Sequence, residues 1–133
     1  MGLDPEYKEE ANMHKVPKVV VGVDVSKAHL DVCIEPIGRT LKIANSKSGI
    51  DGLIKSFSEY QVEKVVYEST GGYENLLQSM LRKASYQTWC VDPKRIKYFI
   101  RSLNKKAKTD KVDAMMIAKF ARKNEIDYQP FIA

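Results

Sequence analysis

The spacing of apolar and polar residues predicts five short strands and four helices. Runs that are β-branched or that alternate between apolar and polar residues predict strands over residues 18–24, 28–35, 39–44, 64–68 and 86–91. Apolar residues recur at helical spacing over residues 48–60, 73–83, 93–103 and 110–123. Ser48 is suited to cap the first of these helices, and Pro93 to take the first position of the third.

The order of these elements indicates an α/β fold. The connections between the first three strands are short and contain Ser26, Pro36 and Gly38, so these strands are expected to be antiparallel. The later strands alternate with helices, which favours parallel crossovers. We therefore expect a mixed five-stranded sheet with helices on both faces, which is the arrangement of the ribonuclease H-like fold.

Length and composition fit one globular domain, residues 18–133, preceded by a flexible polar tail at residues 1–17. The chain has 133 residues, of which 44% are hydrophobic and 29% charged, as in ordinary globular proteins. Because no apolar run reaches the roughly 18–20 residues of a membrane span, we expect a cytoplasmic protein without a membrane partner. Cys33 and Cys90 lie in strand-like runs and are expected to be buried, reduced thiols.

The net charge of +5 is unevenly distributed along the chain. Between Lys94 and Lys111 there are eight Lys or Arg residues and a single acid, Asp110. A basic block of this kind favours a polyanionic partner, although a solvated basic face gives the same pattern. Tyr98 could stack on bases, whereas Trp89 is more typical of the core because it lies within a predicted strand.

Four acids are candidates for chemistry. Asp24 and Glu68 stand at the carboxyl ends of the first and fourth predicted strands, which are parallel neighbours in the expected sheet. Asp110 and Asp113 are three residues apart, so on a helix they would share one face. If that helix packs across the strand ends, the four carboxylates converge.

Converging carboxylates repel one another, and divalent cations would supply the missing positive charge. Oxygen ligands of this kind suit Mg²⁺ or Mn²⁺, and two such ions about 3.5–4 Å apart can stabilise the attacking and leaving oxygens of a phosphodiester. Each acid alone is more often a turn or cap residue. The combination of spacing and predicted structure favours the catalytic interpretation.

Three motifs together resemble a known family. They are Gly-Val-Asp-Val-Ser-Lys at 22–27, Glu-Ser-Thr-Gly-Gly-Tyr at 68–73 and Lys-Thr-Asp-Lys-Val-Asp-Ala at 108–114. Over roughly residues 18–130 the chain resembles the N-terminal domain of the DEDD transposases of bacterial insertion sequences, a group that includes the pilin-gene inverting recombinases.

This resemblance implies a RuvC-like catalytic domain in which Asp24, Glu68, Asp110 and Asp113 bind Mg²⁺ or Mn²⁺. It implies DNA strand cleavage and transfer by a multimer, guided in some members by a structured RNA. The family also has a C-terminal domain with a serine implicated in the chemistry. The chain ends at Ala133 without such a domain, so we do not expect complete recombination from it alone.

Basic residues near the acids are the expected contacts to nucleic acid: Lys27, Lys94, Arg95, Lys97, Arg101, Lys105, Lys106, Lys108 and Lys111. Ser26 is expected to shape its loop or contact phosphate. The backbone of Ser69 and Thr70 could receive a phosphate, but an ordinary capped turn is the favoured interpretation.

Three other functions stay open at this point. A Holliday-junction nuclease shares the fold and differs only in the family motifs. A non-catalytic nucleic-acid-binding module would use the basic stretch and ignore the acids. A fragment of a sugar kinase or actin-like ATPase also places an Asp after its first strand, but the turn after Asp24 lacks the glycine that such phosphate loops usually carry.

Overall fold

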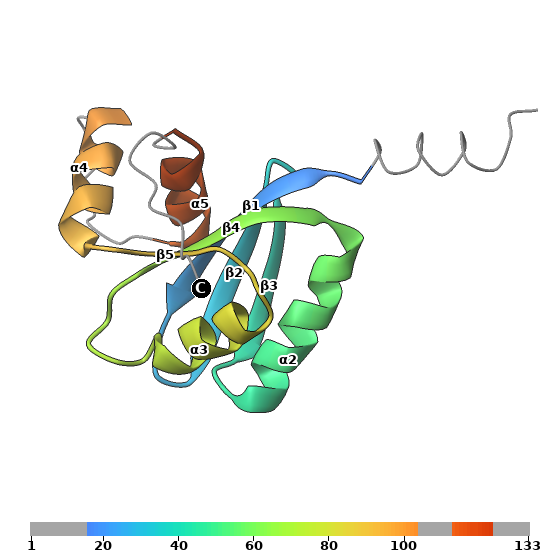
Figure 1. Cartoon of the computed structure of the whole chain (residues 1–133). Coiled ribbons are helices and arrows are strands. Elements are labelled where there is room, and N and C mark those ends of the chain that lie inside the picture. Colours follow the sequence, from blue (N-terminus) through green and yellow to red (C-terminus); the bar gives the residue numbers. More distant parts are fainter. Residues whose placement is uncertain (1–15, 104–112, 124–133) are drawn as a thin grey trace, which may run out of the picture.

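The computed structural model describes residues 16–103 and 113–123 (Figure 1). Its strands are β1 (Lys18–Val25), β2 (His29–Glu35), β3 (Arg39–Ala44), β4 (Gln61–Glu68) and β5 (Thr88–Val91). Its helices are α2 (Lys47–Ser56), the short 3-10 helix η1 (Phe57–Glu59), α3 (Asn75–Lys83), α4 (Pro93–Leu103) and α5 (Ala114–Lys123). The predicted tail lies almost entirely outside these residues.

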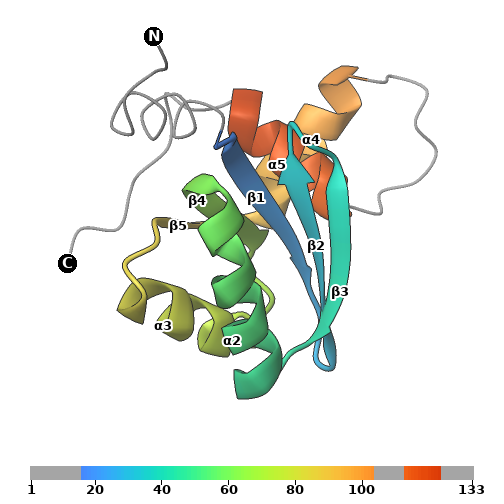
Figure 2. The same ribbon diagram turned by 90° about the vertical axis from the view of Figure 1, so that its right-hand side faces the viewer.

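The five strands form one mixed sheet in the order β3-β2-β1-β4-β5. β2 pairs antiparallel with both β1 and β3, whereas β4 lies parallel to both β1 and β5. Helices α2 and α3 cover one face of the sheet, and α4 and α5 lie on the other (Figure 1, Figure 2). The predicted α/β class, antiparallel opening and two-sided helix cover are therefore confirmed.

The face of the sheet toward α2 and α3 carries the larger apolar core. Alternate residues of β1, namely Val19, Val21 and Val23, point into it and are at most 1% exposed. Leu77 and Leu81 of α3 meet them, and both are fully buried. Period-2 strands facing a period-3.6 helix thus produce the closed core that the sequence pattern predicts.

The face toward α4 and α5 depends on a glycine. A Cβ on Gly22 would meet the Ala114 carbonyl oxygen and lie 2.5 Å from the Ala118 nitrogen, closer than real side chains come. Gly22 therefore lets α5 pack directly on β1. Trp89 and Phe120 complete this smaller core with ring centroids 5.2 Å apart, and Trp89 is 7% exposed, which confirms its predicted place in the core.

Two local predictions were wrong. Ser46, not Ser48, caps α2, because its extended backbone lets its hydroxyl accept a hydrogen bond from the Gly49 amide at 3.1 Å. Cys90 is exposed, since it alternates with the buried Trp89 and Val91 on the edge strand β5.

In the described ranges, no helix is long and apolar enough to cross a membrane.

Candidate active site

Asp24 and Glu68 lie side by side at the carboxyl ends of β1 and β4. In the register of these parallel strands Val23 stands opposite Tyr67, so the next residue along each strand is one of the acids. Each acid comes two residues after a residue that faces α4 and α5, namely Gly22 on β1 and Val66 on β4. Residues two apart on a strand point to the same face. The carboxylates are therefore on the same face of the sheet, and each is partly buried.

The Glu68 carboxylate is in an unfavourable environment for its charge. Its Oε1 atom is buried and has no hydrogen-bond partner among the residues that the structure describes. Burial raises the pKa of Glu68, the neighbouring Asp24 charge raises it further, and Lys97 of α4 opposes both. A buried acceptor without a donor beside a second acid is an arrangement that a bound cation would relieve.

Asp31 is a third acid on this face, and it was not among the acids predicted from the sequence. It pairs directly with Asp24 across β1 and β2, and with Lys42 across β2 and β3. Cross-strand partners lie about 5 Å apart, and like charges in this position repel. The short turn that joins the first two strands contained the necessary signal, because it fixes which residues face each other.

Asp113 caps α5 and does not lie within a helix. Its carboxylate accepts a hydrogen bond from the Met116 amide at 2.9 Å, and α5 begins at Ala114. Asp113 therefore stands at the start of the helix and not within it as predicted, because its carboxylate accepts one of the free amides of the first turn. Asp110 lies outside the described residues.

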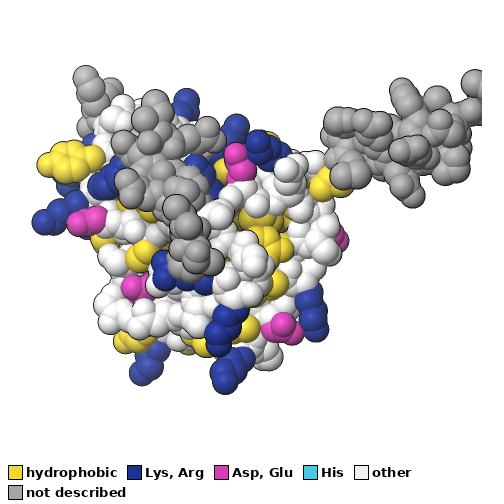
Figure 3. All heavy atoms as spheres, in the orientation of Figure 1, with side chains coloured by type: hydrophobic (Ala, Val, Ile, Leu, Met, Phe, Trp, Pro, Cys, Tyr) yellow, Lys and Arg dark blue, Asp and Glu magenta, His cyan; other side chains and the backbone are white. Residues whose placement is uncertain are grey.

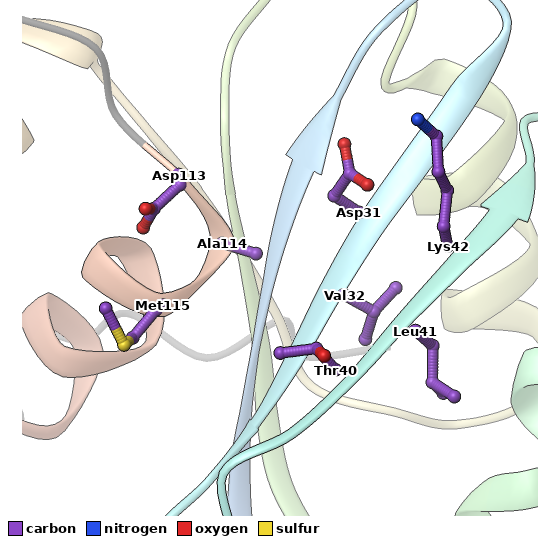
Figure 4. A pocket seen from close by; sticks show the side chains of 8 residues that line it. All are labelled: Asp31, Val32, Thr40, Leu41, Lys42, Asp113, Ala114 and Met115. Carbon is purple, nitrogen blue, oxygen red and sulfur yellow. The ribbon is translucent and has the colours of Figure 1, made fainter.

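A pocket of about 430 Å³ separates Asp113 from the sheet (Figure 4). Asp31 and Lys42 line its sheet side, and Asp113 and Met115 line its helix side. Over the part of the chain that the structure describes, no three His, Cys, Asp or Glu side chains are placed to hold one metal ion. The structure thus brings Asp24 and Glu68 together, with Asp113 bordering the adjacent pocket.

The loop after Glu68 is organised by a second glutamate, Glu74. Its Oε1 accepts hydrogen bonds from the Thr70 amide at 3.1 Å, the Thr70 hydroxyl at 2.6 Å and the Gly72 amide at 3.0 Å. Burial raises the pKa of Glu74, but these hydrogen bonds outweigh burial and the pKa is lowered overall. The amides of Ser69 and Thr70 are therefore already used, the first by the Val91 carbonyl and the second by Glu74, which supports the predicted capped turn over a phosphate site.

The loop after Asp24 is a compact hairpin turn. The Ser26 hydroxyl donates a hydrogen bond to the His29 carbonyl at 2.9 Å and accepts one from the His29 amide at 3.3 Å. Ser26 thus shapes the loop, one of the two roles predicted for it. Lys27 is exposed in this turn, two residues beyond the end of β1, the strand that carries Asp24.

The outer side of α4 is basic and accessible (Figure 3). Lys94, Lys97 and Arg101 are exposed, and Tyr98 between them is 72% exposed. Arg95 differs from these residues, because its guanidinium lies over the rings of Trp89 and Phe120 at 5.5 and 5.7 Å. The predicted contacts Lys105, Lys106, Lys108 and Lys111 lie outside the described residues.

Comparison with known proteins places the chain in a family. Residues 21–131 match the model of the IS110-type DEDD transposases, whose description is "Transposase". Because this match spans most of the chain, the protein belongs to the DEDD transposase family of this type. Among curated proteins, none matches the chain.

A solved structure shares the fold. It is T. thermophilus RuvC in complex with a Holliday junction substrate, with a TM-score of 0.56 and 12% sequence identity. The match covers 86% of this chain and 99% of the other. The chain therefore has a RuvC-like fold, as the element order and the motif resemblance predicted.

Proposed function

We propose that this chain is the catalytic domain of a DNA transposase or site-specific recombinase, and that it cleaves and transfers phosphodiester strands with the help of divalent cations. The observation that carries the proposal is the Asp24–Glu68 pair, two carboxylates at adjacent strand ends on one face of the sheet. Membership of the transposase family supports the same reaction class and DNA as the partner.

The donor set fits a hard divalent cation such as Mg²⁺ or Mn²⁺. Glu68 offers a buried oxygen atom that no group in the described residues satisfies, and Asp24 is close enough to raise its pKa. We propose that Asp24 and Glu68 hold the cation, together with Asp110 and Asp113. When bound, such ions supply Lewis-acid stabilisation of charge on the attacking and leaving oxygens of a phosphodiester.

The protein's own residues would orient the nucleic acid. Lys27 and the exposed lysines and arginine of α4 lie on elements that border the acid pair, and Lys97 acts electrostatically on Glu68 itself. We propose that these cations contact backbone phosphates, which positions a strand without reading its sequence. We also propose that a guide RNA is a partner of this protein and that several copies of the full-length protein assemble.

The first test is Mn²⁺ binding by isothermal titration calorimetry. Asp24→Asn and Glu68→Gln should each weaken Mn²⁺ affinity by on the order of tenfold or more. Asp51→Asn is the matched control, because Asp51 is exposed on α2 and forms a surface ion pair with Lys55 at 3.2 Å. Unchanged affinity in both site variants would contradict the proposed metal centre.

The second test separates the basic surface from the acids. Alanine variants of Lys94, Lys97 and Arg101 should weaken DNA binding and reduce its salt dependence, whereas Asp24→Asn should leave binding of the DNA backbone largely intact. Intact binding in the triple variant would exclude α4 as the contact surface. Cleavage confined to four-way junctions would instead favour a junction nuclease.

A further inference from the structure

Asn45 connects the loops that follow the two acid-bearing strands. It stands just after β3, and its side-chain Nδ2 donates to the Ser26 carbonyl at 2.9 Å and to the Tyr73 carbonyl at 3.0 Å. Its backbone amide donates to the Ala28 carbonyl at 2.9 Å. One residue thus joins the turn after β1, the end of β3 and the loop between β4 and α3.

The position of these contacts relative to the acids gives them their significance. Ser26 comes two residues after Asp24, and Tyr73 comes five residues after Glu68. The two loops are far apart in sequence, and Asn45 uses both of its side-chain amide hydrogens to tie one to the other. Glu74 fixes the remainder of the second loop through Thr70 and Gly72.

We propose that Asn45 is a positioning residue for the acid site, because it locks the loops after Asp24 and Glu68 into one rigid unit. This inference rests on the proposed function of that site. The chemistry favours an amide over other small polar groups, since two carbonyl oxygens need two donors from one short side chain. An ionised Asp has the same shape but only acceptors, and would face both carbonyls with negative charge.

The cost of this arrangement supports a specific role. Asn45 Oδ1 is buried and has no hydrogen-bond partner among the described residues. A buried acceptor without a donor costs free energy, so an apolar side chain would fill the same space at lower cost. The structure keeps the amide, whose donors reach both loops.

Hydrogen exchange tests the connection itself, independently of any metal. In Asn45→Ala, the amides of Ser26 and Gly72 should exchange about tenfold faster, whereas amides in the centre of β1 should follow only the change in global stability. Asn75→Ala is the matched control, because Asn75 is an exposed asparagine at the start of α3. Unchanged exchange at Ser26 and Gly72 would overturn the proposal.

Mn²⁺ titration of the folded variants tests whether the connection matters to the site. Asn45→Ala and the isosteric Asn45→Asp should both weaken Mn²⁺ affinity by about tenfold, while Asn75→Ala should not. Normal affinity in Asn45→Asp despite faster loop exchange would show a packing role and overturn positioning. If the unsubstituted protein binds no Mn²⁺, the proposed function fails, and the exchange data still decide whether Asn45 connects the loops.

Discussion

The two faces of the sheet differ sharply in chemistry although they share the same strands. The face toward α2 and α3 presents an apolar core built from alternate strand residues such as Val21, Leu30 and Val65. The face toward α4 and α5 carries several ionisable side chains, among them Asp24, Asp31, Cys33, Glu35, Lys64 and Glu68. Burial therefore stabilises the fold mainly through one face, while the other retains costly polar groups.

This difference indicates a division of labour between stability and chemistry. Burying charged groups costs free energy unless they are paired or coordinated, so a face that keeps them has a reason other than stability. Cys33 illustrates the environment: burial, followed by the charges of Glu35 and Asp113, raises the pKa of its thiol to about 11. The thiol is therefore protonated at neutral pH and unsuited to act as a nucleophile.

The largest expected effect is on the apolar face. Leu77→Ala should lower the free energy of unfolding by about 2–5 kcal/mol, because it leaves a cavity at a fully buried position. Urea denaturation measures this, and the Mn²⁺ affinity of the folded variant should not change. Met115→Ala, at a 42% exposed position, is the control and should change stability by less than about 0.5 kcal/mol. A loss of metal affinity in folded Leu77→Ala would contradict the division of labour.

Gly22→Ala should disturb the opposite face. The added methyl group must push α5 away from β1, at a cost of about 1–3 kcal/mol, and Trp89 fluorescence should report the altered contact with Phe120. Gly52→Ala is the matched control, because a Cβ there meets nothing within 4 Å. That substitution in α2 should stabilise the protein by about 0.5–1 kcal/mol, so equal destabilisation by both variants would refute the proposed close approach.

Glu74→Gln should destabilise the protein by about 1–2 kcal/mol at neutral pH, since a charged acceptor binds three donors. The pKa of Glu74 is lowered from its ordinary value of 4.5, so its contribution is present above that pH and is lost as the pH falls through the lower value. The melting temperatures of Glu74→Gln and of the unsubstituted protein should therefore become equal in acid. A difference that grows below pH 4.5 would contradict this sign.

Glu68→Gln should have the smallest effect and the opposite sign. The pKa of Glu68 is raised above its ordinary value of 4.5, so the fold favours the protonated form, and stability is lost as the pH rises through the higher value. The variant should therefore be more stable at neutral pH, by less than about 1 kcal/mol, and equal to the unsubstituted protein in acid. Added Mn²⁺ should raise the melting temperature of the unsubstituted protein only.

Much of the fold could be predicted because its determinants are local. The bounds of β3 agree fully with the alternation of residues 39–44, and Pro93 begins α4 as expected, with the Asp92 carboxylate accepting from the Lys94 amide at 2.9 Å. Element ends were less predictable. The start of α5 depends on the Asp113 carboxylate accepting a helix amide, which periodicity does not reveal.

The sequence by itself determined the strand and helix order, the family motifs and the pairing of Asp24 with Glu68, because periodicity and strand-end position are properties of short segments. The position of Asp31 beside Asp24 follows from the short turn between β1 and β2. Only the tertiary structure decided that Asn45 joins two distant loops and that Asp113 borders a pocket beside the sheet. These two relations depend on which segments meet in space. Such contacts form between segments far apart in the chain, where no local pattern of residues records them.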